Sequence, residues 1–426
     1  MRIIEIKGDD YKEVLDEILN RGEDNFADID KTVMEIIEGV KRDGDEALYR
    51  YTEKFDGVKL TGLKVTGDEI DEALEIVGSE FLDILREARD NIASYHEKQL
   101  QNSWMTNEKN GIILGQLINP LSRVGIYVPG GKAAYPSTVL MNSIPAKVAG
   151  VKSIAMVTPP GKEGKVNPYI LAAAKVAGVD EIYKIGGAQS VAALAYGTRI
   201  IKPVEKIVGP GNIYVARAKR AVFGLVDIDM IAGPSEICII ADENKNPKYI
   251  AADLLSQAEH DEMASSILVT TSRTLGEKVI EEVKVQTERL ERKEIIEKAL
   301  SSYGYIFIVE DIEKAIEISN EIAPEHLEIM VDNPFELLPM IKNAGAIFLG
   351  EYTPEPVGDY FAGPNHTLPT SGTAKFSSPL GTYDFIKKSS LLYYKRQSLE
   401  KIKDKVITFT EAEGLTAHGN SIKVRF

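Results

Sequence analysis

Apolar residues along the chain follow two different spacings. Between residues 28 and 102 they recur at helical spacing with charged residues between them, as in IDKTVMEIIEGVKRDGDEALYRYTEKF. This period is typical of amphipathic helices, and Gly44 and Gly57 interrupt it. The spacing therefore predicts a mainly helical region that is broken at these two glycines.

From about residue 123 the pattern changes to short apolar runs that alternate with helical stretches. The first series is RVGIYVPGG, SIAMVTPP, EIYKIGG and KIVGPG, and the second is ICIIAD, SILVTTS, YIFIVED and AGAIFLG. Such alternation is typical of βαβ units around a parallel sheet. We therefore predict an α/β fold of two Rossmann-like lobes with parallel sheets, N-terminal helices and a small C-terminal segment.

These changes of pattern divide the chain into five segments. We expect an N-terminal segment, a helical region packed on the second lobe, a first α/β lobe, a second α/β lobe and a C-terminal segment, with bounds at 1–21, 22–122, 123–234, 235–380 and 381–426. The last segment is expected to contain helix and a strand at KVITFT. In open parallel sheets ligands bind beyond the carboxyl ends of the strands, so those ends are candidate contact points.

The bulk composition excludes several classes of protein. A net charge of −15 argues against a nucleic-acid or anionic-membrane partner, since both require clustered Lys and Arg. No run approaches the roughly 20 apolar residues of a membrane span, and MRIIEIKGDDYKE lacks the apolar region of a signal peptide. Cys238, the single cysteine, leaves no intrachain disulfide and fits a reducing compartment. We therefore expect a cytoplasmic protein.

One predicted helix carries polar side chains at the edge of its apolar stripe. It begins at Asn246-Pro247, a cap residue followed by proline. Gln257 and His260 are three positions apart and project from the same side, as helical metal ligands often do. For an isolated Q-x-x-H, a polar helix end lying over the core is the commoner explanation. This stretch alone leaves both interpretations open.

The chain has only five histidines, and four of them lie in segments dense with other polar groups. His96 is the exception, and the charged helix around it predicts a solvated surface position. The four others are His260, His326 beside Glu325 in APEHLE, His366 with Asp359 in GDYFAGPNHTLPTSG, and His418 near Glu413 in EAEGLTAHGN. Imidazole nitrogens together with Asp and Gln oxygens suit zinc or a similar divalent ion.

Two glycine-bearing turns are candidates for nucleotide contact. GPGNIY, residues 209–214, follows a predicted strand and opens a helix, but it lacks the third glycine of G-x-G-x-x-G. VPGGKAAYPS is a second strand-to-helix turn, whose backbone amides can hold a phosphate at a helix N-terminus. The turns alone leave NAD binding undecided, and no residue discriminates NADP from NAD.

Taken together, these segments resemble the histidinol dehydrogenase family. The similar stretches run in order from about residue 119 to residue 418, and they are GIYVPGGKAAYPSTVLMN, GGAQSVAALAYGT, KIVGPGN, AGPSEI, DLLSQAEH, APEHLE, GDYFAGPNHTLPT and EGLTAH. Several such blocks together are far more specific than one Q-x-x-H. The resemblance implies an enzyme that oxidises L-histidinol through the aldehyde to L-histidine with two NAD⁺, the last step of histidine biosynthesis.

The resemblance also implies roles for individual residues. The implied zinc ligands are Gln257, His260, Asp359 and His418. The implied catalytic pair is Glu325 and His326. The implied substrate contacts are Ser235, His366 and Glu413, together with the zinc ligands and His326. The implied NAD contacts are Tyr127, Gln189 and Asn212 in the first lobe. The family is a homodimer whose C-terminal segment reaches the partner's site, so Glu413 and His418 would serve the neighbouring subunit.

The reaction needs a base for each hydride transfer, and His326 suits that role. A thiol can activate the aldehyde for the second oxidation, but Cys238 lies in a run that predicts a buried strand. Hydration to a gem-diol is then the remaining route, with Glu325 activating water, and zinc would anchor the substrate's imidazole and amine.

Three alternatives remain open on the sequence. One is a zinc- and NAD-dependent dehydrogenase of another amino alcohol or diol. A second is a zinc hydrolase in which Glu325 activates metal-bound water, although such an enzyme has no need of the turns YVPGGK and GPGN. The third is a protein stabilised by a structural zinc, for which a ligand set containing Gln and Asp is a poor match.

Overall fold

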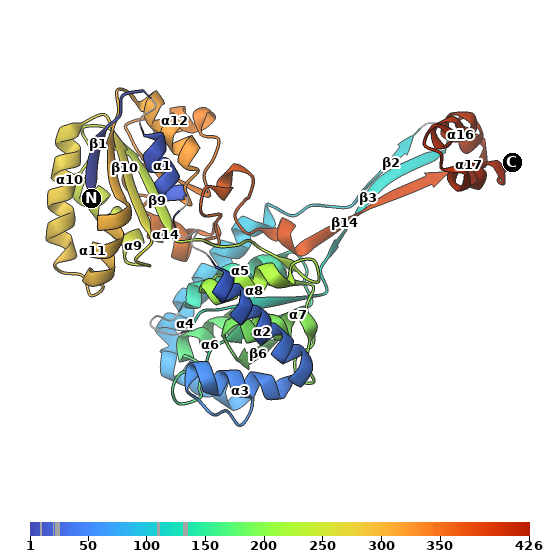
Figure 1. Cartoon of the computed structure of the whole chain (residues 1–426), viewed down its shortest axis with the longest axis horizontal. Helices are drawn as coiled ribbons and strands as arrows, with labels where there is room; N and C mark the ends of the chain where they lie inside the picture. Colours follow the sequence, from blue (N-terminus) through green and yellow to red (C-terminus); the bar gives the residue numbers. More distant parts are fainter. Residues whose placement is uncertain (9–10, 20, 22–25, 109–110, 131–134) are drawn as a thin grey trace.

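The computed structural model describes residues 1–8, 11–19, 21, 26–108, 111–130 and 135–426. Within these ranges the chain forms two α/β lobes and a long arm that projects from them and ends in helices (Figure 1). The predicted fold class is confirmed. In the described part of the chain no helix has the length and apolar character needed to cross a membrane.

The first lobe is built on a parallel sheet with the order β6-β5-β4-β7-β8. Its strands are β4 (Arg123–Tyr127), β5 (Ser153–Thr158), β6 (Glu181–Lys184), β7 (Lys206–Val208) and β8 (Asp227–Ile228). The helices between them are α5 (Pro136–Val148), α6 (Pro168–Ala177), α7 (Gly187–Tyr196) and α8 (Ile213–Val222). The strand order reverses between β4 and β7, where a crevice opens at the carboxyl ends of the strands.

The second lobe has a six-stranded parallel sheet with the order β1-β11-β10-β9-β12-β13. The strands are β1 (Arg2–Glu5), β9 (Glu236–Ala241), β10 (Ser265–Thr270), β11 (Gly304–Ile308), β12 (His326–Met330) and β13 (Ala346–Leu349). One face is covered by α9 (Pro247–Ala258), α10 (Arg273–Thr287) and α11 (Lys293–Tyr303), and the other by α1 (Lys12–Leu19) and α12 (Ile312–Ile322). The short helices α13 (Pro334–Leu337) and α14 (Glu355–Val357) follow β12 and β13.

The helical region packs on the first lobe, so the prediction that it covers the second lobe is wrong. It comprises α2 (Ala27–Asp43), α3 (Asp45–Asp56) and α4 (Gly67–Glu97), with Gly44 and Gly57 at the predicted breaks. The apolar stripe of α2 lies against α7 and α8, and that of α4 lies against α5 and α6. Because α5, α6 and α7 are apolar on most sides, they need a second covering layer.

His96 is also placed differently from the prediction. It is fully buried near the end of α4, and its Nδ1 lies 2.8 Å from the carbonyl oxygen of Ile92. Burial lowers the pKa of this imidazole. Charged neighbours along the sequence do not decide exposure here, because His96 lies on the stripe of α4 that includes Leu85 and Ile92 and faces the first lobe.

The arm is an antiparallel sheet with the order β14-β3-β2. It combines β2 (Trp104–Glu108) and β3 (Ile112–Pro120) with β14 (Ile386–Tyr394), and α15 (Arg396–Glu400), α16 (Lys403–Ala412) and α17 (Thr416–Lys423) lie at its far end (Figure 1). KVITFT is helical within α16, so the predicted strand is wrong: its two threonines bond preceding carbonyls and α17 packs on α16. Tertiary packing overrides the β-propensity of this run.

Candidate active site

A cleft with a cavity volume of about 270 Å³ is lined by residues of both lobes. The first lobe contributes the carboxyl-end turns after β4 and β7 and the start of α5. The second lobe contributes the residue before β9, the residues at the amino end of β12, the end of α9, and residues 359, 360 and 366. The residues that line the cleft include Thr138, Asn212, Ser235, Gln257, His260, Glu325, His326, Asp359 and His366.

In the second lobe the cleft lies at the amino ends of the strands. His326 begins β12 and Glu325 directly precedes it, Ser235 precedes β9, and Gln257 lies at the end of the helix that returns from β9 to β10. The expectation that contacts occur at carboxyl ends therefore holds for the first lobe and is wrong for the second. The reason is that the cleft lies between two sheets. The first lobe faces it with the carboxyl ends of its strands, and the second lobe faces it with the amino ends.

A tight backbone turn places the catalytic pair. The helix α12 ends at Ile322, its C-cap residue Ala323 has a left-handed φ of 51°, and Pro324 follows. A non-glycine residue in this region carries conformational strain, which the surrounding structure must support. The turn leads into β12, which begins at His326, and both Glu325 and His326 are buried.

His326 contacts polar groups on both sides of its ring. Its Nδ1 lies 3.0 Å from the carbonyl oxygen of Glu236 and 3.0 Å from Nε2 of Gln257, and its Nε2 lies 3.4 Å from Oδ1 of Asp359. Burial alone would lower the pKa of His326, but the charges of Glu325 and Asp359 outweigh it and hold the pKa well above its ordinary value. The ring therefore has a high proton affinity and is held in one orientation.

Glu325 is a buried partner of His326 and not a solvated neighbour. Its Oε2 accepts a hydrogen bond from the backbone N–H of Glu236 at 3.0 Å and lies 3.7 Å from Nδ1 of His326. Burial raises the pKa of Glu325 to about 8, against the opposing charge of His326. A carboxyl group with a pKa near neutrality can both accept and return a proton.

Three of the four predicted metal ligands line the cleft. Gln257 is buried, and its Oε1 has no hydrogen-bond partner among the described residues. His260 has an exposed side chain at the cleft, yet the dense surroundings still lower its pKa, which favours the neutral ring that binds metals. Burial would raise the pKa of Asp359, but its hydrogen bond to His326 prevails and the pKa is lowered. An amide oxygen without a partner, a neutral imidazole and a carboxylate fit a divalent cation such as zinc.

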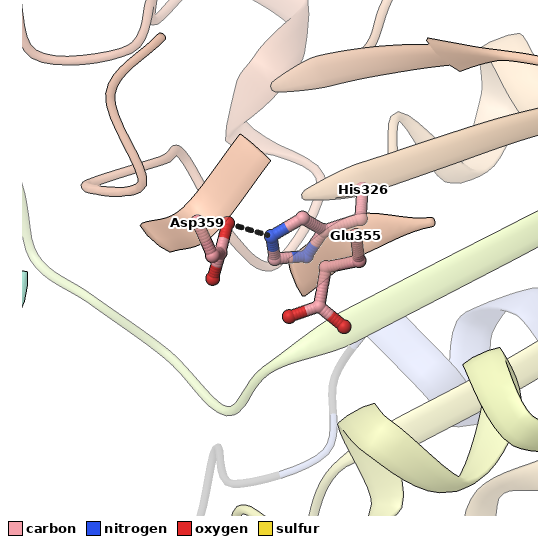
Figure 2. Close-up of side chains that lie close together, drawn as sticks. All are labelled: His326, Glu355 and Asp359. Carbon is pink, nitrogen blue, oxygen red and sulfur yellow. Dashed lines mark ion pairs between the residues drawn. The ribbon is translucent and has the colours of Figure 1, made fainter. Parts of the chain in front are cut away.

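Glu355 also lies in this group, although it is not among the residues predicted from the sequence. The ligand atoms of His326, Glu355 and Asp359 all lie within 4.8 Å of one another. Figure 2 shows these three side chains close together. Burial raises the pKa of Glu355 to about 7, and its Oε2 accepts a hydrogen bond from Ser256 at 2.7 Å. The spacing of four residues between Glu355 and Asp359, typical of one helix face, is the signal that would have found it.

His366 and Ser235 also lie where the resemblance predicts substrate contacts. The Nδ1 of His366 is 3.0 Å from the carbonyl oxygen of Asp359, and its Nε2 is 3.4 Å from Oγ1 of Thr138. Burial lowers the pKa of His366. His366 thus orders its own loop and faces the cleft at the same time, while half-buried Ser235 lines the cleft just before β9.

Of the three predicted NAD contacts, only Asn212 lines the cleft. Its side chain caps α8 by accepting from the N–H of Val215 at 3.2 Å. Tyr127 and Gln189 are buried and do not line the cleft, and the hydroxyl of Tyr127 accepts a hydrogen bond from the N–H of Gly187 at 3.2 Å. A Cβ on Gly209 would collide with the carbonyl of Tyr127, so only glycine allows the GPGN turn this close to β4. The other candidate turn, VPGGKAAYPS, lies partly outside the described residues, at 131–134.

Glu413 and His418 are not brought to the cleft within one chain. They lie at the end of α16 and in α17, both with exposed side chains, at the far end of the arm (Figure 1). The structure therefore unites eight of the predicted residues in one cleft, and these are Asn212, Ser235, Gln257, His260, Glu325, His326, Asp359 and His366.

The fold and the site define a two-lobed α/β protein with a buried histidine–carboxylate centre between its lobes. A sequence model of the family "Histidinol dehydrogenase" matches residues 19–426. Histidinol dehydrogenase of Clostridium acetobutylicum is 60% identical over 100% of this chain and 99% of its own, and that of Caldanaerobacter subterraneus subsp. tengcongensis is 60% identical over 97% and 96%. The crystal structure of histidinol dehydrogenase from Elizabethkingia anophelis is 38% identical, with a TM-score of 0.95, over 100% of this chain and 98% of that one. The chain therefore belongs to the histidinol dehydrogenase family, which confirms the resemblance and the prediction of a dehydrogenase.

Proposed function

We propose that this chain oxidises L-histidinol through L-histidinal to L-histidine with two NAD⁺, as the last step of histidine biosynthesis in the cytoplasm. The observation that carries the proposal is the cleft itself. It sets the buried pair Glu325 and His326 beside a group of potential metal ligands and opposite the turn that holds Asn212. The names of the relatives support the choice of substrate.

In the first oxidation His326 takes the proton of the substrate hydroxyl while hydride passes from the carbinol carbon to the nicotinamide. In the second, water adds to the aldehyde, Glu325 accepts one of its protons, and protonated His326 returns to the aldehyde oxygen the proton that it took from the alcohol. The resulting gem-diol then loses a proton to His326 and hydride to a second NAD⁺. His326 is held for both steps by its contacts with Glu236 and Asp359.

The route through a thiol does not suit this chain. Cys238 lies in the middle of the second-lobe sheet, fully buried, and burial raises the pKa of its thiol to about 12. A buried thiol without thiolate character is not a nucleophile. The gem-diol route therefore remains.

Gln257, His260 and Asp359 would hold the zinc ion, with His418 of the partner subunit as the fourth ligand. When bound, the ion supplies a Lewis acid that fixes the imidazole and amine of the substrate. His326 stays outside this set because we assign it the role of base, with its Nδ1 in contact with Glu236 and Gln257. His366 and Ser235 would bind the substrate from the adjoining wall.

A homodimer would complete the site. The arm places Glu413 and His418 far from the cleft of their own chain, where a second copy can receive them (Figure 1). Apolar side chains are exposed along the arm and its helices, and these are Trp104, Met105, Leu392, Tyr393, Phe409 and Val424. A cluster of this kind favours contact with another protein surface.

The stoichiometry of the cofactor tests the proposed function. With zinc present, limiting L-histidinol and excess NAD⁺ are expected to yield two NADH for each histidinol consumed, both for the natural chain and for Cys238→Ala. One NADH would indicate a simple alcohol dehydrogenase and would exclude the role of Glu325 in the second oxidation. No NADH in protein shown to contain zinc would point to another substrate or to hydrolysis.

Glu325→Gln is expected to stabilise the protein at alkaline pH. The pKa of Glu325 is about 8 in the fold, above its ordinary value of 4.5, so the folded state binds this proton more tightly. Stability from the protonated group is complete below about pH 4.5 and is lost as the pH rises to 8. Neutral glutamine avoids that loss and keeps the acceptor for the N–H of Glu236.

Thermal unfolding of zinc-free protein at pH 5 and pH 9 measures this effect. We expect Glu325→Gln to gain on the order of 1–3 kcal/mol at pH 9 and little at pH 5. Glu243→Gln, at an exposed position, is the matched control. An equal change in the free energy of unfolding at both pH values would show that ionisation of Glu325 does not destabilise the folded protein.

A further inference from the structure

The backbone of Glu236 contacts both members of the catalytic pair. Its N–H donates to Oε2 of Glu325 at 3.0 Å, and its carbonyl oxygen lies 3.0 Å from Nδ1 of His326. Glu236 begins β9, which is hydrogen-bonded to β12 with His326 opposite Ile237. The backbone of this one residue therefore helps to hold both side chains of the pair in place.

The side chain of Glu236 is held by a buried arginine from the N-terminal segment. The Nη2 of Arg21 lies 2.7 Å from Oε1 of Glu236, and the two side chains are 0% and 2% exposed. The N–H of Ser371 donates to the same oxygen at 3.0 Å, whereas Oε2 has no hydrogen-bond partner among the described residues. A buried carboxylate with one cationic partner depends strongly on that partner, because removing it leaves an uncompensated charge.

Arg21 also joins three other backbone segments at this point. Its guanidinium donates to the carbonyl oxygens of Met263 at 2.9 Å, Ile18 at 2.5 Å and Pro234 at 3.4 Å. Pro234 precedes Ser235, so the same guanidinium supports the segment that lines the cleft before β9. The planar, multiply donating head of arginine suits this arrangement, and a lysine provides only one point charge in its place.

We infer that Arg21 is a positioning residue for Glu325 and His326, acting through Glu236. Arg21 is not among the described residues that line the cleft, so its effect on the reaction passes through the backbone of β9. The inference rests on the proposed function for its catalytic consequence. Its structural consequence, a fixed environment for the His326 ring, does not depend on the substrate.

Two variants and a matched control test the inference. Arg21→Met removes the charge, and Arg21→Lys keeps it while losing the additional donors. Lys206→Met is the control: Lys206 is also buried, pairs with Asp227 at 3.0 Å, and begins β7 at the end of that strand away from the cleft. This control measures the loss of stability and activity that follows from removing a buried ion pair away from the cleft.

The first measurement is the NMR spectrum of histidine side chains labelled with ¹³C and ¹⁵N. The chain has five histidines, and His326→Asn assigns the signal of interest. We expect the His326 signals to move in Arg21→Lys and Arg21→Met and to stay in place in Lys206→Met. Unmoved His326 signals in Arg21→Lys would overturn the inference, even if Arg21→Met fails to fold.

The second measurement is steady-state oxidation of L-histidinol by zinc-loaded protein. We expect Arg21→Met to lower kcat by about 10- to 100-fold and to leave KM for NAD⁺ unchanged. Lys206→Met is expected to lower the unfolding temperature without this loss of kcat. Equal kcat in Arg21→Met and Lys206→Met would overturn the inference. If the natural chain forms no NADH, the proposed function is disproved instead. The NMR result then still decides the role of Arg21.

Discussion

Replacement of His326 by asparagine is expected to lower kcat for L-histidinol by about 10²- to 10⁴-fold. The ring contacts Glu236, Gln257 and Asp359 together, and the charges around it hold its pKa well above the ordinary value. Asparagine is smaller than the imidazole and cannot accept the substrate proton. Steady-state rates of NADH formation measure the effect, and both oxidations should be slowed.

The expected pattern separates loss of the base from loss of binding. Zinc content and the dissociation constant for NADH should be unchanged in His326→Asn, because the predicted ligands and Asn212 remain. His96→Asn is the matched control, a buried histidine whose Nδ1 contacts the Ile92 carbonyl of its own helix. If His326→Asn keeps its kcat, or loses activity only in proportion to lost zinc, His326 is not the base.

The sequence predicted those parts of the site that depend on one element at a time. Gln257 and His260 follow from the apolar stripe of a single capped helix, and Asn246 does cap that helix by accepting from the N–H of Lys248. Cys238 follows from an unbroken apolar run and is fully buried. In such cases the local pattern and the tertiary environment agree.

The errors occur where two elements far apart in the sequence decide the outcome. His96 has charged sequence neighbours, but the stripe of α4 that contains it is covered by the first lobe. The helical region itself had two apolar surfaces available, and periodicity does not tell which lobe it covers. The position of Glu325 at the amino end of a strand depends on how the two sheets face each other. The sequence of residues 320–330 contains no pattern that predicts this arrangement. Glu355 was missed because the proline-rich segment around it hides a short helix.

Two variants that are inactive alone are expected to restore activity when they share a dimer. His326→Asn damages the cleft of its own chain, while His418→Ala, by the proposed function, damages the cleft of its partner. A dimer of one chain of each kind has one cleft with both defects and one cleft with neither. Mixed dimers isolated through two different affinity tags should therefore show about half of the activity of the natural dimer.

The opposite arrangement gives the decisive control. A chain that carries both substitutions, paired with a natural chain, has one defect in each cleft if His418 acts on the partner, and such dimers should be inactive. If His418 instead served its own chain, the natural chain would keep a complete cleft, this second dimer would be half active, and the first would be inactive. The arm favours the first outcome, because it holds α17 far from the lobes that carry Gln257, His260 and Asp359 (Figure 1). The two dimers together thus decide whether each zinc site is built from two chains.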